Sequence, residues 1–198
     1  MSIPTLRTPR LVLRPFTLDD APVVQHLAGA YEVASTTLNM PHPYEDGMAE
    51  AWIKTHEAAC DAGEGVVLAM TSKDDGVIGA LGLSLTPAHR RGELGYWIGR
   101  PYWNRGYATE AGKALLGWAF DALELNRIQA QHFTRNPASG RVVHKIGMEF
   151  EGIRRQHFLR FGEFEDVTVY AILRSDRPRS SPHSPEQNRV AAGGDPRE

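Results

Sequence analysis

Residues 96–111 carry the residue types of an anion-binding site. Asn104, Arg105 and Gly106 separate an apolar strand from an amphipathic helix that is predicted to begin at Tyr107. The first N–H groups of a helix lack partners within the helix and carry the positive end of its dipole. Because a glycine beside them allows close approach, the segment suits a phosphate or pyrophosphate, and Arg105 could add charge. An ordinary strand–loop–helix connection is the alternative interpretation.

Other signatures of catalytic and nucleotide sites are missing from the sequence. There is no G-x-x-x-x-G-K-[S/T] and no G-x-G-x-x-G after a strand, which excludes a P-loop nucleotidase and a Rossmann dinucleotide site. The eight histidines form no H-E-x-x-H or other ligand spacing, so we expect no metal. Cys60, the single cysteine, excludes an internal disulfide and has no visible base partner, which disfavours an acyl-cysteine intermediate.

Composition narrows the classes of partner. The 198 residues include 22 basic and 24 acidic side chains, for a formal charge of −2, and this balance argues against nucleic-acid binding. No run approaches 18 apolar residues, and the N-terminus lacks the apolar stretch of a signal peptide, so we expect no membrane partner and a cytoplasmic location. The length suits one domain, which we place at residues 1–174. Residues 175–198, rich in proline, serine and charge, are expected to form a disordered polar tail.

The elements that must position the anion site follow a mixed α/β order, β-α-α-β-β-β-α-β-α-β-β. Apolar periodicity and turn residues predict strands at 10–15, 66–70, 77–85, 93–98, 127–134, 148–158 and 164–173. Helices are predicted at 17–30, 45–62, 107–123 and 137–146, with residues 31–44 as a loop. In this order Asn104, Arg105 and Gly106, which we call the anion segment, follow the fourth predicted strand.

Residues 103–111 resemble the acyl-CoA-binding motif of the GNAT superfamily of N-acyltransferases. Residues 8–15, 93–98 and 136–148 match in order the branch that includes the ribosomal-protein alanine N-acetyltransferases. Trp103 stands at the position of a Gln or Arg in the general motif, and Asn104 replaces a frequent glycine. The resemblance implies a mixed, mostly antiparallel sheet of six to seven strands, with helices on both faces and a splayed fourth and fifth strand.

The resemblance also implies a co-substrate, acetyl-CoA, and the residues that hold it. The loop amides would bind the pyrophosphate, the open edge of the fourth strand would pair with the pantetheine, and an N–H near Trp97 or Ile98 would polarise the thioester carbonyl. The cofactor-binding residues implied in this way are Tyr96, Trp97, Ile98, Trp103, Asn104, Arg105, Gly106, Tyr107, Ala108, Thr109, Asn136 and Ser139.

Two residues are candidates for proton transfer under this interpretation. An alkylammonium is mostly protonated at pH 7, so a base is useful, and Glu93 lies on the strand that leads to the thioester. Ser139 is placed by the resemblance near the CoA sulfur. Glu93 could instead be a strand-edge charge or an ion-pair partner of Arg91, and Asn136 and Ser139 could merely cap their helix.

The acceptor is expected to be a primary amine of a protein N-terminus or of a small molecule. The acyl group is expected to pass directly from CoA to this amine in a ternary complex. It would enter between residues 31–44 and 158–164, where Glu163 and Glu165 would suit a cationic amine. Protein N-termini, polyamines, amino acids and aminoglycosides all remain open, as does an acyl group longer than acetyl. A non-catalytic CoA-binding regulatory module on the same fold is the alternative function, and exposed aromatic residues on the final hairpin would permit a homodimer.

Overall fold

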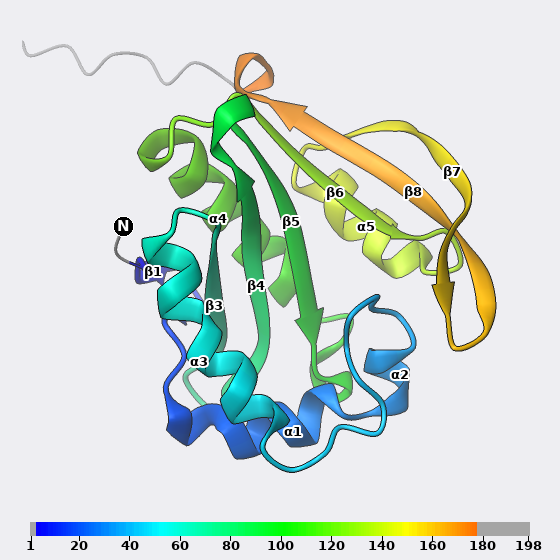
Figure 1. Cartoon of the computed structure of the whole chain (residues 1–198). Coiled ribbons are helices and arrows are strands. Elements are labelled where there is room, and N and C mark those ends of the chain that lie inside the picture. The colour runs from blue at the N-terminus through cyan, green and yellow to red at the C-terminus, as the bar shows by residue number, and fades with distance from the viewer. Residues whose placement is uncertain (1–2, 178–198) are drawn as a thin grey trace, which may run out of the picture.

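An eight-stranded sheet forms the centre of the protein, which was studied as a computed structural model that describes residues 3–177. The strand order is β1-β2-β3-β4-β5-β6-β8-β7, and every neighbouring pair is antiparallel except β5 and β6 (Figure 1). The strands are β1 (Leu6–Arg7), β2 (Leu11–Arg14), β3 (Gly65–Ser72), β4 (Gly76–Thr86), β5 (Arg91–Ile98), β6 (Arg127–Phe133), β7 (Glu149–Arg160) and β8 (Glu163–Leu173).

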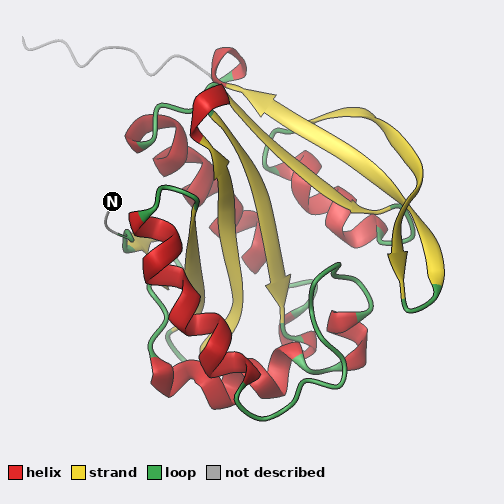
Figure 2. Ribbon diagram, in the orientation of Figure 1, coloured by secondary structure: helices red, strands yellow, loops and turns green. Residues whose placement is uncertain are grey.

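Helices cover both faces of this sheet, and short loops join them to the strands (Figure 2). α1 and α3 lie on one face and α4 and α5 on the other (Figure 1). The α-helices are α1 (Ala21–Ala28), α2 (Tyr31–Ala34), α3 (Met48–Asp61), α4 (Tyr107–Ala122) and α5 (Pro137–Lys145), and single 3-10 turns lie at Leu18–Asp20, Pro87–His89, Arg100–Tyr102 and Arg174–Asp176.

The mixed α/β fold with helices on both faces is confirmed, and three details of the prediction are corrected. The sheet has eight strands because β1, only two residues long, pairs with β2, and so short a segment has no detectable period. Residues 31–44 are not all loop, since α2 forms a single turn there. The helix predicted from residue 45 begins at Met48, because Gly47 adopts a left-handed conformation with φ of 82°.

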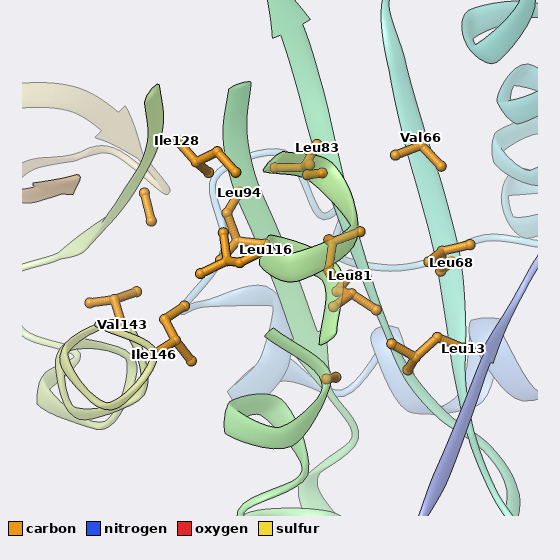
Figure 3. Packing of buried hydrophobic residues seen from close by; sticks show 14 of the residues in the cluster. Leu13, Val66, Leu68, Leu81, Leu83, Leu94, Leu116, Ile128, Val143 and Ile146 are labelled. Carbon is orange, nitrogen blue, oxygen red and sulfur yellow. The ribbon is translucent and has the colours of Figure 1, made fainter. Parts of the chain in front are cut away.

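Two apolar cores bind the helices to the sheet. Figure 3 shows the larger core, in which Leu83 of β4 and Leu94 of β5 meet Leu116 of α4 and Val143 of α5. The smaller core packs α1 and α3 against the other face, where Trp97 is 8% exposed. β5 therefore contributes alternate side chains to the two cores, as a central strand covered on both faces must.

The parallel pair β5–β6 opens into a fork. Its pairing runs from Arg91 opposite Arg127 to Leu94 opposite Ala130 and then stops, although both strands continue. Residues 95–98 remain paired with β4 on their other side. The splayed strands implied by the resemblance, the fourth and fifth of the prediction, are these two, and their divergence is visible in Figure 1.

The described structure extends slightly past the predicted domain end at residue 174. Arg177 forms an ion pair with Asp121 of α4, with 2.6 Å between Nη1 and Oδ1. Most of the tail predicted at 175–198 lies outside the described residues, so both the domain boundary and the tail stay predictions.

Candidate active site

The fork opens into a cleft with a volume of about 1150 Å³. This exceeds the 300–1,000 Å³ usual for a single small ligand and leaves room for two substrates. The cleft is lined by all but one of the predicted catalytic and cofactor-binding residues: Glu93, Tyr96, Trp97, Ile98, Trp103, Asn104, Gly106, Tyr107, Ala108, Thr109, Asn136 and Ser139. The exception is Arg105, whose guanidinium lies over the ring of Tyr102, 5.6 Å from its centroid, and does not line the cleft.

The backbone of the anion segment turns sharply into α4. Asn104 and Gly106 both adopt positive φ, 61° and 79°, and Gly106 is the N-cap residue. Asparagine tolerates this conformation better than most side chains, which explains how Asn104 replaces a glycine. The indole N–H of Trp103 donates to the carbonyl of Ile98 at 2.7 Å and ties the segment to the end of β5. The unpaired N–H groups at the start of α4 thus border the cleft.

An ion pair from the turn between β1 and β2 anchors this segment. Glu110, in the first turn of α4, accepts hydrogen bonds from the hydroxyl of Thr8, the N–H of Arg10 and Nε of Arg10, at 2.7, 2.9 and 2.6 Å. Although burial opposes it, these donors lower the pKa of the Glu110 carboxyl. Nη1 of Arg10 donates to the carbonyl of Arg105 at 2.9 Å, and its guanidinium lies over the ring of Tyr107. Arg10 therefore offsets a negative charge that would otherwise oppose an anion at this helix N-terminus.

The edge of β5 that faces the fork carries free backbone groups. The N–H of Gly99 donates to the carbonyl of Ile78, and an antiparallel ladder alternates, so Trp97 also directs its backbone groups toward β4. Tyr96 and Ile98 then direct theirs toward the fork. Of the two residues predicted to polarise the thioester carbonyl, Trp97 and Ile98, only Ile98 directs its N–H toward the fork. The carbonyl of Ile98 accepts the indole N–H of Trp103.

Glu93 lies at the closed end of the fork, on the face that carries α1 and α3. Its two carboxylate oxygens accept hydrogen bonds from the side-chain amides of Gln129 and Gln131 of β6, both at 2.8 Å. No ion pair with Arg91 occurs among the described residues. The carboxylate is thus oriented by neutral donors and borders the cleft without a cationic partner.

Ser139 lies in the first turn of α5, on the opposite face of the sheet. Its hydroxyl is 2.6 Å from that of Tyr96, and either can donate. Burial raises the pKa of Tyr96 to about 12, although the Ser139 hydrogen bond opposes this, so the phenol keeps its proton at neutral pH. Asn136 caps the helix by accepting the N–H of Ser139 at 3.2 Å. The capping interpretation of Asn136 is therefore correct, and its side chain also borders the cleft.

Several residues that border the cleft or support its side chains were missed by sequence reasoning. They are the hydroxyl of Tyr96, the amides of Gln129 and Gln131, and the basic side chains of Arg141 and Lys145 on α5. Alternation along β6 places Gln129 and Gln131 on one face, and the spacing of four places Arg141 and Lys145 on one side of α5. These signals identify shared faces, but not which face meets the cleft.

The acceptor entrance differs from the prediction in its charges. Phe158 borders the cleft, as expected, but neither Glu163 nor Glu165 does. Glu165 is 13% exposed and accepts a hydrogen bond from Nε of Arg135 at 2.7 Å. The guanidinium of Arg160 donates to the carbonyls of Ala34 and Met40 at 2.8 and 2.5 Å. These contacts join the β7–β8 hairpin to the segment that follows α2.

Residues 3–177 hold neither a candidate metal site nor a candidate membrane-spanning helix. No group of three or more His, Cys, Asp or Glu side chains is placed to hold a metal ion. No helix in this part of the chain combines the length and apolar character needed to cross a membrane. The expected independence from metals and the cytoplasmic location stay predictions.

Comparison with known proteins agrees with this geometry. The family described as "Acetyltransferase (GNAT) domain" matches residues 10–149. The N-acetyltransferase YoaA of Bacillus subtilis is 33% identical over 173 residues, covering 86% of this chain and 97% of that protein. A solved acetyltransferase of the GNAT family from Bacillus anthracis has a TM-score of 0.75 and 25% identity, covering 86% of this chain and 98% of that one.

A mixed α/β fold with a forked sheet and a large cleft is that of an acetyltransferase, and the chain belongs to the GNAT family of N-acetyltransferases. The predicted branch is confirmed by its relatives. The uS5-alanine N-acetyltransferase of Escherichia coli is 29% identical over 83 residues, which is 42% of this chain and 43% of that protein. Mycobacterium smegmatis RimJ, solved with a CoA disulfide, shares the fold with a TM-score of 0.78 at 22% identity, covering 89% of each chain.

Proposed function

We propose that the protein transfers an acetyl group directly from acetyl-CoA to a primary amine while both substrates are bound. The observation that carries this proposal is the fork, where an unpaired strand edge, a helix N-terminus and a carboxylate border one cleft. The CoA bound to the structurally similar RimJ supports the choice of co-substrate.

The cofactor half of the cleft lies between β5 and α5. The N–H groups that begin α4 would hold the pyrophosphate, and the basic side chains of Arg141 and Lys145 would add attraction for phosphate. The free backbone groups of Tyr96 would pair with the pantetheine amides. The N–H of Ile98 then has the placement to stabilise the oxyanion of the tetrahedral intermediate.

Proton transfer would use groups from the two faces of β5. Glu93 takes a proton from the ammonium of the acceptor, and the neutral nitrogen attacks the thioester carbon. When the C–S bond breaks, the thiolate takes a proton from the hydroxyl pair of Ser139 and Tyr96. The amine loses a second proton as the amide forms, and this proton returns to the hydroxyl pair. The proton held by Glu93 then passes to solvent, so that one proton is released per turnover. Because the fork connects the two faces, base and acid reach the reacting atoms from opposite sides.

Release of free thiol from acetyl-CoA in the presence of primary amines tests this function. We expect thiol and acetylated amine, identified by mass spectrometry, in equal amounts. Without an amine we expect no acetylated protein, because no nucleophilic side chain takes part. Binding of acetyl-CoA without release of thiol from any amine would instead show a non-catalytic CoA-binding module.

A further inference from the structure

The half of the cleft opposite the cofactor has an apolar wall. Five side chains form this acceptor wall: Leu38, Met40, Phe133, Phe158 and Val167. Phe133 and Val167 belong to a small buried core at 4% and 1% exposure, and Leu38 and Phe158 pack against it. The wall comes from three separate segments, the loop after α2, the β7–β8 hairpin and β6, so an apolar ligand body would be surrounded.

In the described residues, a single carboxylate borders this half of the cleft. Among the described residues that line the cleft, Glu93 is the only acid, and the basic residues Arg141 and Lys145 lie on α5, on the cofactor side. Two acids of the adjacent β8 strand are engaged elsewhere. The carboxylate of Glu165 is paired with Arg135, and that of Asp166 accepts the N–H of Gln156 at 2.8 Å. Glu93 is therefore the carboxylate of the cleft lining that can pair with an ammonium.

Positive charge lies behind the far end of the acceptor wall. Arg160 donates to the carbonyl of Met40, and its guanidinium lies 3.9 Å from the ring centroid of Phe161. Arg135 is close enough to Arg160 that the two charges repel, and burial and this repulsion lower the pKa of Arg160. A second ammonium on a bound amine would lie among apolar side chains and near the cation of Arg160, and an unpaired buried charge is strongly unfavourable.

We propose that the acceptor is a primary amine with one positive charge on an apolar alkyl or aryl body, and that polyamines and aminoglycosides are poor acceptors. The proposal rests on the transferase function above. The ammonium would lie at Glu93, and the apolar body would contact the acceptor wall.

A matched pair of amines gives the sharpest test. Hexylamine and 1,6-diaminohexane have the same length and differ in one terminal ammonium. With saturating acetyl-CoA, we expect kcat/KM per amino group from thiol release to be at least about tenfold higher for hexylamine. Equal or faster reaction of the diamine, or of spermidine, would overturn the monoamine proposal while leaving the transferase intact. If acetyl-CoA binds and no amine releases thiol, the transferase function itself fails.

Two variants locate the effect on the acceptor wall. Phe158→Ala is expected to lower kcat/KM for hexylamine about tenfold and to change it less than about twofold for ethylamine, which is too short to contact the wall fully. Met40→Glu places a second carboxylate in the wall and is expected to shift the ratio at least about fivefold toward the diamine. Unchanged ratios in variants that still bind acetyl-CoA would overturn the placement of the amine. Thermal stabilisation by acetyl-CoA checks that each variant is folded.

Discussion

Two neutral amides orient the carboxylate of Glu93, and its proposed role as the base has a direct test. Glu93→Gln keeps the size of the side chain and removes its basicity. We expect kcat to fall about 100-fold, because general-base catalysis contributes on that order, with the KM for acetyl-CoA changed less than about twofold. Steady-state thiol release measures both constants.

The control for this variant is Glu163→Gln, an exposed carboxylate on the hairpin that does not border the cleft. Its kinetics should match those of the unaltered enzyme. A Glu93→Gln enzyme with the same pH–rate profile as the original would remove Glu93 as the base.

The hydroxyl pair of Tyr96 and Ser139 makes a second prediction at the scale of residues. Tyr96→Phe leaves the serine hydroxyl in place but removes its buried partner at 2.6 Å. We expect kcat to fall about tenfold and acetyl-CoA binding to persist. Ser139→Ala should have a similar effect, and the double variant should lose little more, because the two act as one unit. Strictly additive losses in this double-mutant cycle would contradict the shared role.

At the scale of elements, the turn between β1 and β2 contacts the anion segment through Arg10. Arg10→Ala leaves the carboxylate of Glu110 near the helix N-terminus without its cation and frees the carbonyl of Arg105. We expect the KM for acetyl-CoA to rise about tenfold with kcat changed less than about twofold. This pattern is expected because the contact stabilises the bound substrate and the transition state equally.

Arg7→Ala is the matched control for Arg10, since Arg7 is an exposed arginine on the adjacent short strand β1. A selective fall in kcat in the Arg10 variant, with unchanged KM, would show that the ion pair does not act on the cofactor site.

Sequence reasoning predicted most elements because each carried a local signal. The α5 helix illustrates this: Asn136 caps it, Pro137 occupies N1, and Gly147 adopts the positive φ of 93° that ends it. The same reasoning reached the anion segment, because glycine and asparagine mark a sharp turn before a helix. Among the strands and α-helices of residues 3–177, β1 and α2 were missed, and both are too short to show a period.

Contacts between distant segments could not be predicted in this way. The bond between Arg10 and Glu110 joins residues 100 positions apart, and Gln131 reaches Glu93 across 38 positions. Alternation indicates which side chains share a face, but the charge around the acceptor entrance depends on which arginine meets which carboxylate. For this reason Glu165 was expected at the entrance and is instead paired with Arg135.

At the scale of the whole molecule, a buried histidine links stability to pH. His56 of α3 is 6% exposed, packs between Phe16 and Trp52, and has no hydrogen-bond partner for either ring nitrogen. Burial lowers its pKa from 6.5 to about 4. The unfolded chain therefore binds a proton between these values that the folded protein does not. The stability present above pH 6.5 is lost as the pH falls toward 4.

We expect the free energy of unfolding to decrease by about 2 kcal/mol between pH 7 and pH 5 on account of His56. Urea denaturation at the two pH values measures this. In His56→Leu, which cannot titrate, this part of the decrease should vanish. An equal decrease in the variant and the original protein would assign the pH dependence to other groups.

The fork between β5 and β6 places the two proposed substrate compartments side by side. The homodimer suggested by the exposed aromatic residues of the hairpin, among them Phe150 and Phe164, stays a prediction.

A crystal structure with acetyl-CoA tests the central claim most directly. We expect the pantetheine to lie in the fork against the free edge of residues 95–98. We also expect the pyrophosphate on the N–H groups that begin α4, and the thioester between Glu93 and Ser139. Acetyl-CoA bound outside the fork, or a fork closed by pairing of β5 with β6 beyond Leu94, would contradict it.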